Sequence, residues 1–349
     1  MIAYFLKKLG YGFLVIFGVT VVVFFIFHAL PGDPSKMIAG SRSTPETIAI
    51  IKNDLGLDKP LPTQFTYYIN DLSIVSVHED TKENEVKYDY FRLFRISDNT
   101  FVIKKPYLRK SYYTDNRVDD MLFDRVGATL VLSVAAMIFA TFFGVIFGII
   151  CALKQNSFID HALVSISVFG ISTPSFVAAI FIALIFGYYL SEYTGLDMTG
   201  SLWILTLDGK ELALKNIILP ALTLGLRPLA IITQLTRSSM IEELCKDYVR
   251  TAKAKGLPQH IVIFKHTLKN AINPVVTAIS NWLATLIAGA FFVEYVFSWK
   301  GLGWLTIDAV QKLDLPVVMG ATLVVAVIFV FITLIVDLLY ALLDPRVRA

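Results

Sequence analysis

Long apolar runs separated by polar segments dominate this chain. Six runs approach or exceed the roughly 20 mainly apolar residues that a helix needs to cross a hydrocarbon core. They lie at about 9–30, 125–153, 160–190, 215–236, 272–297 and 316–341. The runs are continuous rather than alternating, and only helices and closed barrels satisfy every backbone polar group in lipid. The pattern therefore predicts an all-α integral membrane protein with about six transmembrane helices.

The domain organisation follows from the spacing of these runs. Residues 1–30 form the first predicted transmembrane helix, 31–124 a long polar segment, and 125–349 a core of five further helices. Composition agrees, because 56% of residues are hydrophobic and 17% charged, whereas soluble domains have roughly 45–50% and 25%. Lys7 and Lys8 precede the first run, but no small-residue cleavage site follows it, so we expect a retained helix rather than a signal peptide.

The polar segment 31–124 has its own predicted structure. Thr44–Leu55 reads as a helix, with Thr44 as N-cap and Pro45 in the first turn. Glu85–Ile96 and Thr100–Ile103 are rich in Val, Tyr, Phe and Ile on either side of a turn-forming Ser-Asp-Asn sequence. This arrangement predicts a β-hairpin.

Lys and Arg in the short loops indicate the orientation. With the N-terminus inside, the inner segments carry twelve cationic residues and the short outer loops four. The inner ones are Lys7, Lys8, Lys154, Arg237, Lys246, Arg250, Lys253, Lys255, Lys265, Lys269, Arg346 and Arg348, and the outer ones are Lys210, Lys215, Lys300 and Lys312. We therefore expect both termini in the cytoplasm and segment 31–124 outside.

The loop between the fourth and fifth predicted helices, about residues 243–270, has the most informative pattern. Asp247–Lys255 predicts a short helix, Gly256 a break, and the following residues a second amphipathic helix. The small residues Ala252 and Ala254 let another backbone approach closely, so the shape suits a knob that docks in a groove of a cytosolic partner. The residues by themselves equally allow an interfacial helix that its lysines hold to anionic lipid.

This loop resembles the coupling loop of ABC importer permeases, often called the EAA loop. In the peptide-permease branch its form is close to Tyr-Val-Arg-Thr-Ala-x-Ala-Lys-Gly, with a His, an Asn and a Pro further on. The matching residues are Tyr248, Val249, Arg250, Thr251, Ala252, Ala254, Lys255, Gly256, His266, Asn270 and Pro274. A match of this length is highly specific and favours the docking knob over the lipid-bound helix.

Other blocks resemble the same family and together cover nearly the whole chain except about 72–105. They are Pro31–Pro34, Leu55–Pro60, Leu219–Leu222, Leu235–Met240, Glu294, Phe297, Ser298, Gly301–Gly303, Asp314 with Pro316, and Asp344–Arg348. The sequence departs from the family at Lys300, where a proline is common. It also departs at the insert 72–105, after which a weak match resumes near Lys110-Ser111-Tyr112.

The resemblance implies the fold of an ABC type I importer permease and a transport function. Two homologous permease chains would form the pathway in a prokaryotic inner (plasma) membrane. Two ATP-binding cassette ATPase subunits would bind the coupling loops, and an extracytoplasmic binding protein would deliver substrate, most simply di- or oligopeptides. Gly209-Lys210 is followed by Glu211, so the chain lacks a phosphate-binding loop. We expect no enzyme activity, no cofactor and no nucleic-acid partner for this subunit.

Polar residues within the predicted helices suggest further sites. Arg227 falls near the centre of the fourth helix beside Pro228, where a charge costs roughly 2.5–3.5 kcal/mol. It either meets a substrate carboxylate in the pathway or pairs with a carboxylate of the partner chain. Pro228 and Pro174 are expected to bend their helices, and Asp337 and Asp344 to pair with the basic inner face. The histidines are too dispersed for a metal site.

Two other function classes fit the sequence less well. An intramembrane enzyme would need a Ser/His dyad, paired aspartates or an H-E-x-x-H motif, and the predicted helices contain none. A receptor or scaffold would need a signalling domain, and none is recognisable in the sequence. Within importers the cargo stays open, because nickel and some sugar systems share this permease family and no residue separates them.

Overall fold

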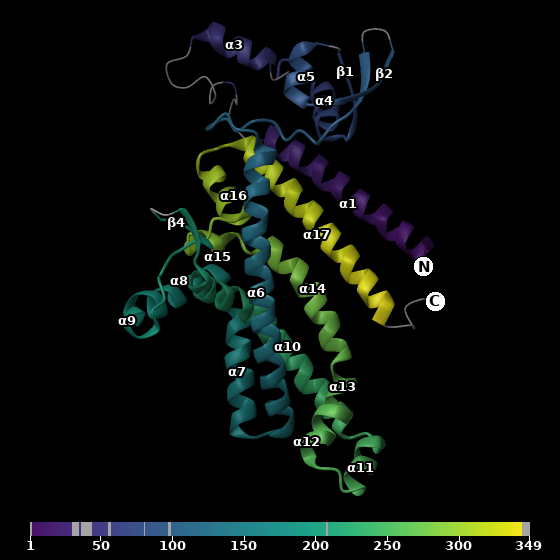
Figure 1. Cartoon of the computed structure of the whole chain (residues 1–349), viewed down its shortest axis with the longest axis vertical. Helices are drawn as coiled ribbons and strands as arrows, with labels where there is room; N and C mark the ends of the chain where they lie inside the picture. The colour runs from purple at the N-terminus through teal and green to yellow at the C-terminus, as the bar shows by residue number, and fades with distance from the viewer. Residues whose placement is uncertain are drawn as a thin grey trace. The chain divides into compact units, whose positions relative to one another are not determined.

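The computed structural model describes residues 2–29, 35, 44–54, 57–79, 81–96, 99–206 and 209–343. The chain divides into two compact units. Unit 1 comprises Met1–Val15, Arg125–Ile307 and Val325–Ala349, and unit 2 comprises Ile16–Asp124 and Asp308–Val324. Figure 1 labels many of the elements of the two units.

Among the described residues, four stretches of helix are long and apolar enough to cross a membrane. The first is Leu6–Ile26, within α1 (Ile2–Ala29), and the second is the whole of α6 (Val118–Leu153). The third is Leu214–Leu244, which comprises the short 3-10 helix η2 (Leu214–Ile217) and α10 (Ile218–Leu244). The fourth is Leu315–Leu338, within α17 (Leu315–Leu343). Two bent pairs also qualify. They are α7 (Phe158–Ser172) with α8 (Ser175–Leu184) and η1 (Ile185–Tyr189), bent by 112°, and Gln259–Ala271 with α14 (Asn273–Gly289), bent by 54°. Counting each pair as one span gives six, which confirms the predicted number.

The bend predicted at Pro174 is present. α7 ends at Ser172, its C-cap Thr173 has an extended backbone, and α8 begins directly after Pro174. Proline lacks the N–H that would continue the helical ladder, and it also disfavours helical geometry in the residue before it. α10 continues through Pro228 without a break.

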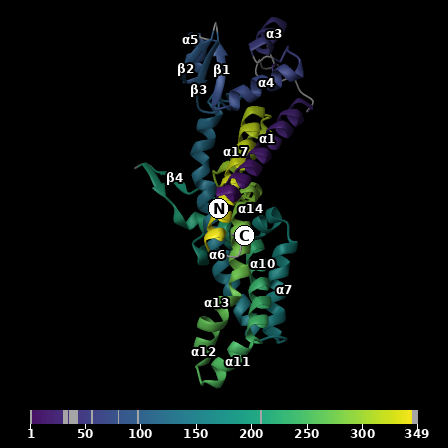
Figure 2. The same cartoon turned by 90° about the vertical axis from the view of Figure 1, so that its right-hand side faces the viewer.

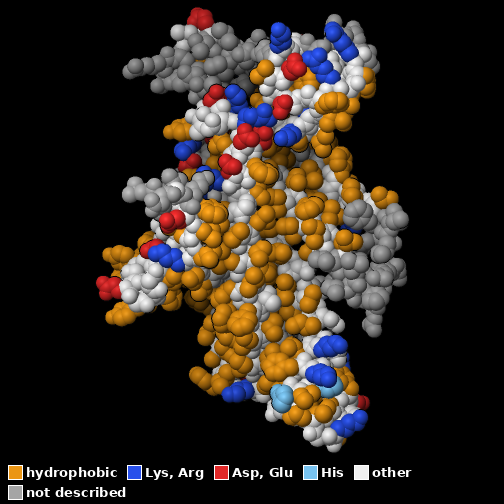
Figure 3. Space-filling view, viewed as in Figure 1, with side chains coloured by type: hydrophobic (Ala, Val, Ile, Leu, Met, Phe, Trp, Pro, Cys, Tyr) orange, Lys and Arg blue, Asp and Glu red, His pale blue; other side chains and the backbone are white. Residues whose placement is uncertain are grey.

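Unit 1 is built around α10, which packs lengthwise against α7 and also contacts α8 and α14 (Figure 1). Its core consists of small and branched apolar side chains from these helices and α6, including Leu132, Ala136, Ala183, Ile232 and Leu286. Small residues let helices approach closely where lipid gives no hydrophobic driving force. The visible face over α6 and α7 is almost wholly hydrophobic in Figure 3.

Shorter elements complete unit 1. They are α9 (Ser191–Thr194), β4 (Trp203–Thr206), β5 (Gly209–Leu212), α11 (Asp247–Ala254), α12 (Gln259–Ile261), η3 (Val262–Thr267), α13 (Leu268–Ala271), α15 (Phe291–Val296) and the start of α16 (Leu302–Gln311). β4 and β5 pair as an antiparallel hairpin that the sequence analysis did not anticipate. Figure 2 shows β4 projecting away from α10 and α14, and α11 and α12 beyond the end of α10.

Unit 2 holds the small sheet and its helices. These are α3 (Pro45–Asp54), α4 (Leu61–Leu72), β1 (Val75–Glu79), α5 (Lys82–Tyr88), β2 (Phe91–Ile96) and β3 (Asn99–Ile103). The strand order is β1-β3-β2 with both pairs antiparallel. α3 confirms the helix predicted from Thr44, and β2 with β3 confirms the hairpin.

The predicted start of that hairpin at Glu85 was wrong. Residues 82–88 form α5, because Thr81 acts as its N-cap and accepts a hydrogen bond from the Asn84 backbone N–H at 3.2 Å. The first strand of the hairpin therefore begins at Phe91. The blocks Pro31–Pro34 and Asp344–Arg348 lie outside the described residues.

Candidate functional site

The loop singled out by the sequence folds as a helix–glycine–helix element, residues 243–271. Its first helix, α11, has Asp247 in the first turn, where a carboxylate interacts favourably with the helix dipole. The second part runs through α12, the π-helical η3 and α13. A π-helical segment is rare and often marks a functional position. The predicted helix–break–helix pattern is confirmed.

The break at Gly256 is a complete helix-capping motif. Gly256 has φ +75°, in the left-handed region that favours glycine. Its N–H donates to the Lys253 carbonyl at 3.0 Å, and the Leu257 N–H donates to the Ala252 carbonyl at 3.4 Å. This pair of bonds is the Schellman arrangement that closes a helix C-terminus. Gly256 therefore fixes the direction in which the chain leaves α11.

The interior of the 243–271 element is apolar. Val249, Ala252 and Val262 are buried against one another, with Leu244 and Leu257 packed at their edges. The sequence led us to expect Ala252 on a surface of small residues that a partner approaches. Its burial shows that it is an internal residue instead. Its small side chain lets α11 lie close to η3.

A hydrogen-bond cluster ties the two halves of the element together. The Tyr248 hydroxyl donates to Glu243 Oε2 at 2.5 Å and accepts from Asn270 Nδ2 at 3.1 Å. Asn270 Nδ2 also lies 3.3 Å from the His266 carbonyl oxygen, and Lys246 pairs with Glu243 at 2.5 Å. Burial and the neighbouring carboxylate raise the pKa of Tyr248, so it stays a neutral hydrogen-bond donor. The structure thus brings together Tyr248, His266 and Asn270, which are far apart in the motif.

The outer surface of the element is cationic. Exposed side chains include Arg250, Thr251, Ala254, Lys255, Lys265 and Lys269. Phe264, 59% exposed, is the large apolar side chain among them. Lys, Arg and His side chains gather at the bottom of Figure 3, where α11 and α12 lie in the same view of Figure 1. Pro274 lies in the first turn of α14, at the 54° bend that follows the element.

A second candidate region surrounds Arg227. It lines a cavity of about 70 Å³ in unit 1, at the α7–α8 bend and between α10 and α14. The lining residues are Gly170, Thr173, Ser175, Ala178, Thr223, Leu224, Leu226, Arg227, Trp282, Thr285, Leu286 and Gly289. Pro228 is buried beside it in α10. The Arg227 side chain has no hydrogen-bond or ion-pair partner among the described residues.

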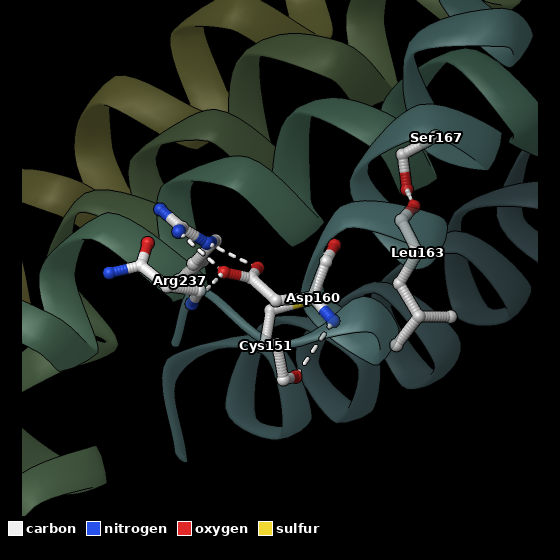
Figure 4. A network of polar contacts seen from close by, with 7 residues as sticks. Cys151, Asp160, Leu163, Ser167 and Arg237 are labelled. Atoms are coloured by element: carbon white, nitrogen blue, oxygen red, sulfur yellow. Dashed lines mark hydrogen bonds and ion pairs between the residues drawn. The ribbon is translucent and has the colours of Figure 1, made fainter. Parts of the chain in front are cut away.

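Sequence reasoning missed a buried ion pair between α7 and α10. Arg237 donates from Nε and Nη2 to the two carboxylate oxygens of Asp160, each at 2.7 Å (Figure 4). Asp160 is 1% exposed and also accepts from the Asn156 N–H at 2.9 Å. Ser157 caps α7 three residues before Asp160, so the Ser-x-x-Asp pattern of a capping box marked the start of the helix. It did not indicate Arg237 as the partner of Asp160.

Other family-like residues meet in two further clusters. In unit 1, Glu294 is fully buried and accepts from the Gly303 and Trp304 N–H groups at 2.8 and 3.1 Å. In unit 2, Asp314 accepts from the Ser111 hydroxyl at 2.5 Å and the Tyr112 N–H at 3.0 Å. Glu294 binds backbone N–H groups at the start of α16, and Asp314 fixes the turn at Ser111 and Tyr112. These positions therefore have structural roles in the described chain.

Asp337, Asp344 and Lys300 are the other single residues that the sequence analysis named. Asp337 pairs with Lys8 at 2.7 Å, which confirms its expected role, whereas Asp344 lies outside the described residues. Lys300 is exposed in its turn, and its carbonyl accepts from Arg125 at 3.3 Å. Within the described part of the chain, no three His, Cys, Asp or Glu residues cluster as a metal site.

Comparison with known proteins shows the family. The model of the family described as binding-protein-dependent transport system inner membrane component matches residues 144–349. The model of the N-terminal region of such membrane components matches residues 1–133. Together the two models cover the chain except residues 134–143.

Curated relatives align over the full chain. The chain is 35% identical to the dipeptide transport system permease protein of Alkalihalophilus pseudofirmus, with all of both chains covered. It is 37% identical to the dipeptide transport system permease protein of Escherichia coli K12 and 34% identical to the glutathione transport system permease protein of Shigella flexneri. Each of these two alignments covers 100% of this chain and 99% of the relative.

A solved structure shares the fold. An inward-facing form of the MetNI methionine ABC transporter superposes with a TM-score of 0.51 at 17% identity, covering 64% of this chain and 96% of that one. The chain belongs to the family of inner membrane components of binding-protein-dependent transport systems, and it is a multi-pass permease subunit of an ABC importer.

Proposed function

We propose that this permease imports di- or oligopeptides and that the 243–271 element couples ATPase closure to transport. Its relatives at 34–37% identity are named as dipeptide and glutathione transport permeases, and all these cargoes are small peptides. Nickel or another small solute is the competing cargo.

The observation that carries the coupling proposal is the internal construction of the element. The Val249–Ala252–Val262 core, the Gly256 cap and the Tyr248–Asn270–Glu243 hydrogen bonds hold it together without a partner. A knob that is already rigid loses little entropy when it docks and transmits force without deforming. Phe264 and the surrounding cations are then free to contact an ATPase groove.

The partners and topology belong to the same proposal. Two ATP-binding cassette ATPases would bind the 243–271 element and its counterpart on a second, homologous permease chain. An extracytoplasmic binding protein would deliver the cargo to the side that carries segment 31–124. Both termini would be cytoplasmic, as the distribution of Lys and Arg favours. ATP-driven closure would rock the helices between two openings.

Uptake in cells that lack this gene tests the cargo. Cells complemented with the wild-type chain should accumulate labelled di- to hexapeptides, and they should gain no uptake of labelled nickel or sugars. Peptide uptake that does not depend on the gene, with gene-dependent nickel or sugar uptake, would refute the peptide cargo.

Substitution of Phe264 tests the coupling. Phe264→Ala should leave the membrane yield normal and reduce the amount of ATPase that co-purifies with the tagged permease. The matched control is Phe158→Ala, because Phe158 is 87% exposed at the start of α7 and lies outside the element. Equal ATPase retention in both variants would contradict docking through Phe264.

A further inference from the structure

The cavity is lined by a cationic side chain, Arg227, that belongs to an apolar membrane-spanning stretch. Arg227 lies thirteen residues after the start and seventeen before the end of the apolar stretch Leu214–Leu244. A cation at such a depth costs roughly 2.5–3.5 kcal/mol unless water or a counter-charge compensates it. Among the described residues no carboxylate pairs with it, whereas Arg237 in the same helix is paired with Asp160. Arg227 lines the cavity, and its donors have no partner within the described part of the chain.

Three hydroxyl groups of the cavity wall can act only as hydrogen-bond acceptors for a ligand, whereas Arg227 can only donate. The hydroxyls of Thr173, Thr223 and Thr285 donate to the carbonyl oxygens of Phe169, Leu219 and Asn281, four residues earlier, at 2.9, 2.8 and 3.1 Å. A hydroxyl has one proton, so each of them offers only lone pairs to a ligand. The wall thus combines one strong donor with several acceptors.

Apart from the Ser175 hydroxyl, the rest of the wall is apolar and partly aromatic. Leu224, Leu286, Ala178 and Trp282 contribute to it. An apolar wall with a few placed polar groups is typical of small-molecule sites. The volume of about 70 Å³ exceeds the roughly 10–15 Å³ that one water needs. It has room for a carboxylate-sized group, so one end of a ligand fits there rather than a whole peptide.

We infer that this cavity is a carboxylate-recognition site of the translocation pathway and receives the free C-terminal carboxylate of a peptide. The inference rests on the proposed peptide cargo. A guanidinium binds a carboxylate through two parallel hydrogen bonds, and the hydroxyl lone pairs accept from peptide N–H groups. A metal cation would be repelled by Arg227, and an uncharged sugar would leave the guanidinium without a counter-charge.

The test compares peptides with and without the carboxylate. Cells lacking the gene are complemented with tagged wild-type chain, Arg227→Gln, Arg227→Lys or the charge control Lys154→Gln, since Lys154 is exposed and outside the cavity. Uptake of labelled tri-alanine and of its C-terminal amide is measured, with the yield of the purified complex. Each variant uses the same binding protein, so its own preference cancels in the ratio between variants.

The expected result is a selective loss. Arg227→Gln should reduce tri-alanine uptake by about 10- to 100-fold, as the loss of a charge-assisted hydrogen-bond pair implies, and change amide uptake less than about twofold. Arg227→Lys should fall between the wild type and Arg227→Gln, and Lys154→Gln should match the wild type. An unchanged acid-to-amide ratio in Arg227→Gln would overturn the carboxylate site. Loss of the second permease chain from that variant's purified complex would overturn it too, because Arg227 would then pair with the partner.

A binding measurement separates this site from the cargo proposal. Trp282 lines the cavity, so tri-alanine should change its fluorescence in the purified complex without binding protein, and tri-alanine amide should not. The signal is taken as the difference between the wild type and Trp282→Phe, and it should vanish in Arg227→Gln. No carboxylate-dependent signal would overturn the site even if peptides are imported. A signal without any peptide uptake would support the site and refute the proposed cargo.

Discussion

The 243–271 element and the sheet of unit 2 distribute polar and apolar side chains in opposite ways. The element buries Val249 and Val262 and exposes its cations. In the sheet, alternate residues of β1 and β3 point to two faces, and the buried ones are Ser76, His78, Thr100 and Val102. The exposed side chains of the sheet include Val75, Val77, Phe91, Phe94 and Ile103. One region has an apolar interior and the other a largely polar one.

The polar interior beneath the sheet is held by Asp71. Its carboxylate accepts from the Tyr88 hydroxyl at 2.9 Å and lies 3.6 Å from Arg109, and its carbonyl accepts from the buried Lys104 ammonium. His78 stacks on Tyr88 with ring centroids 4.1 Å apart. A strand's alternation shows that its two faces differ, but the contacts of the whole cluster decide which face is buried.

Of the changes that test the contrast between the 243–271 element and the sheet, a substitution of Gly256 should have the largest effect on ATPase binding and uptake. Gly256→Val places a β-branched residue at φ +75°, which costs about 1–2 kcal/mol or more. The relief of that strain would redirect the chain between α11 and α12, so ATPase retention and peptide uptake should both be lost while membrane yield stays normal. Co-purification of the ATPases with the tagged variant measures the first, and labelled-peptide uptake the second.

Gly195→Val is the matched control. Gly195 has φ +65°, and like Gly256 it has no atom within 4 Å of an added Cβ. It follows α9, outside the element, so the same local strain should leave the ATPases bound. Normal uptake by Gly256→Val, or loss of ATPases from Gly195→Val as well, would refute a specific role of the 243–271 element.

The two regions also differ in how far the sequence predicted them. Helix–Gly256–helix followed from local signals, because a left-handed glycine after a short helix is a local feature of the chain. The placement of Ala252 in the interior depends on Val262 across the break, and no local pattern shows it. In unit 2, the turn and β-branched residues predicted β2 and β3. The Thr81 cap that makes residues 82–88 helical was overlooked.

Longer-range pairs were harder to predict. Asp160 and Arg237 lie on different helices, so their charges carried no information about each other until α7 and α10 were placed. Pro174 was the opposite case, because proline acts on its own helix and the bend could be predicted.

The second prediction is that acid lowers the stability of the sheet, because its polar interior contains His78. Burial, with Lys104 nearby, lowers the pKa of His78 from 6.5 to about 4, against a smaller opposing effect of Asp71. Between pH 6.5 and 4 the unfolded segment binds a proton that the folded one does not, so stability falls as the pH falls. From pH 7.5 to 5 the loss should be about 2 kcal/mol. Hydrogen exchange of the β1 and β3 amides, corrected for intrinsic rates, measures it.

His78→Phe provides the control for the acid effect. It keeps an aromatic ring against Tyr88 but has no proton to bind, so the pH dependence between 7.5 and 5 should largely disappear. Lys104 is charged in both states over this range, since its pKa is lowered only to about 8 by burial. The exchange of α11 amides should not follow the same pH profile, because the buried core of the element consists of apolar side chains. Equal acid sensitivity of wild type and His78→Phe would contradict the assignment.

The smallest effect is expected from removing the sheet altogether. The Tyr107 N–H donates to the Asp71 carbonyl at 2.9 Å, so the chain ends flanking residues 73–105 are adjacent and two glycines can join them. Asp71 would keep Arg109 as its ionic partner. The sheet belongs to unit 2 and the 243–271 element to unit 1, so ATPase retention should equal that of the wild type, in contrast to Gly256→Val. Loss of the ATPases at normal membrane yield would show that the insert supports the transport core, and the two regions could no longer be treated as separable.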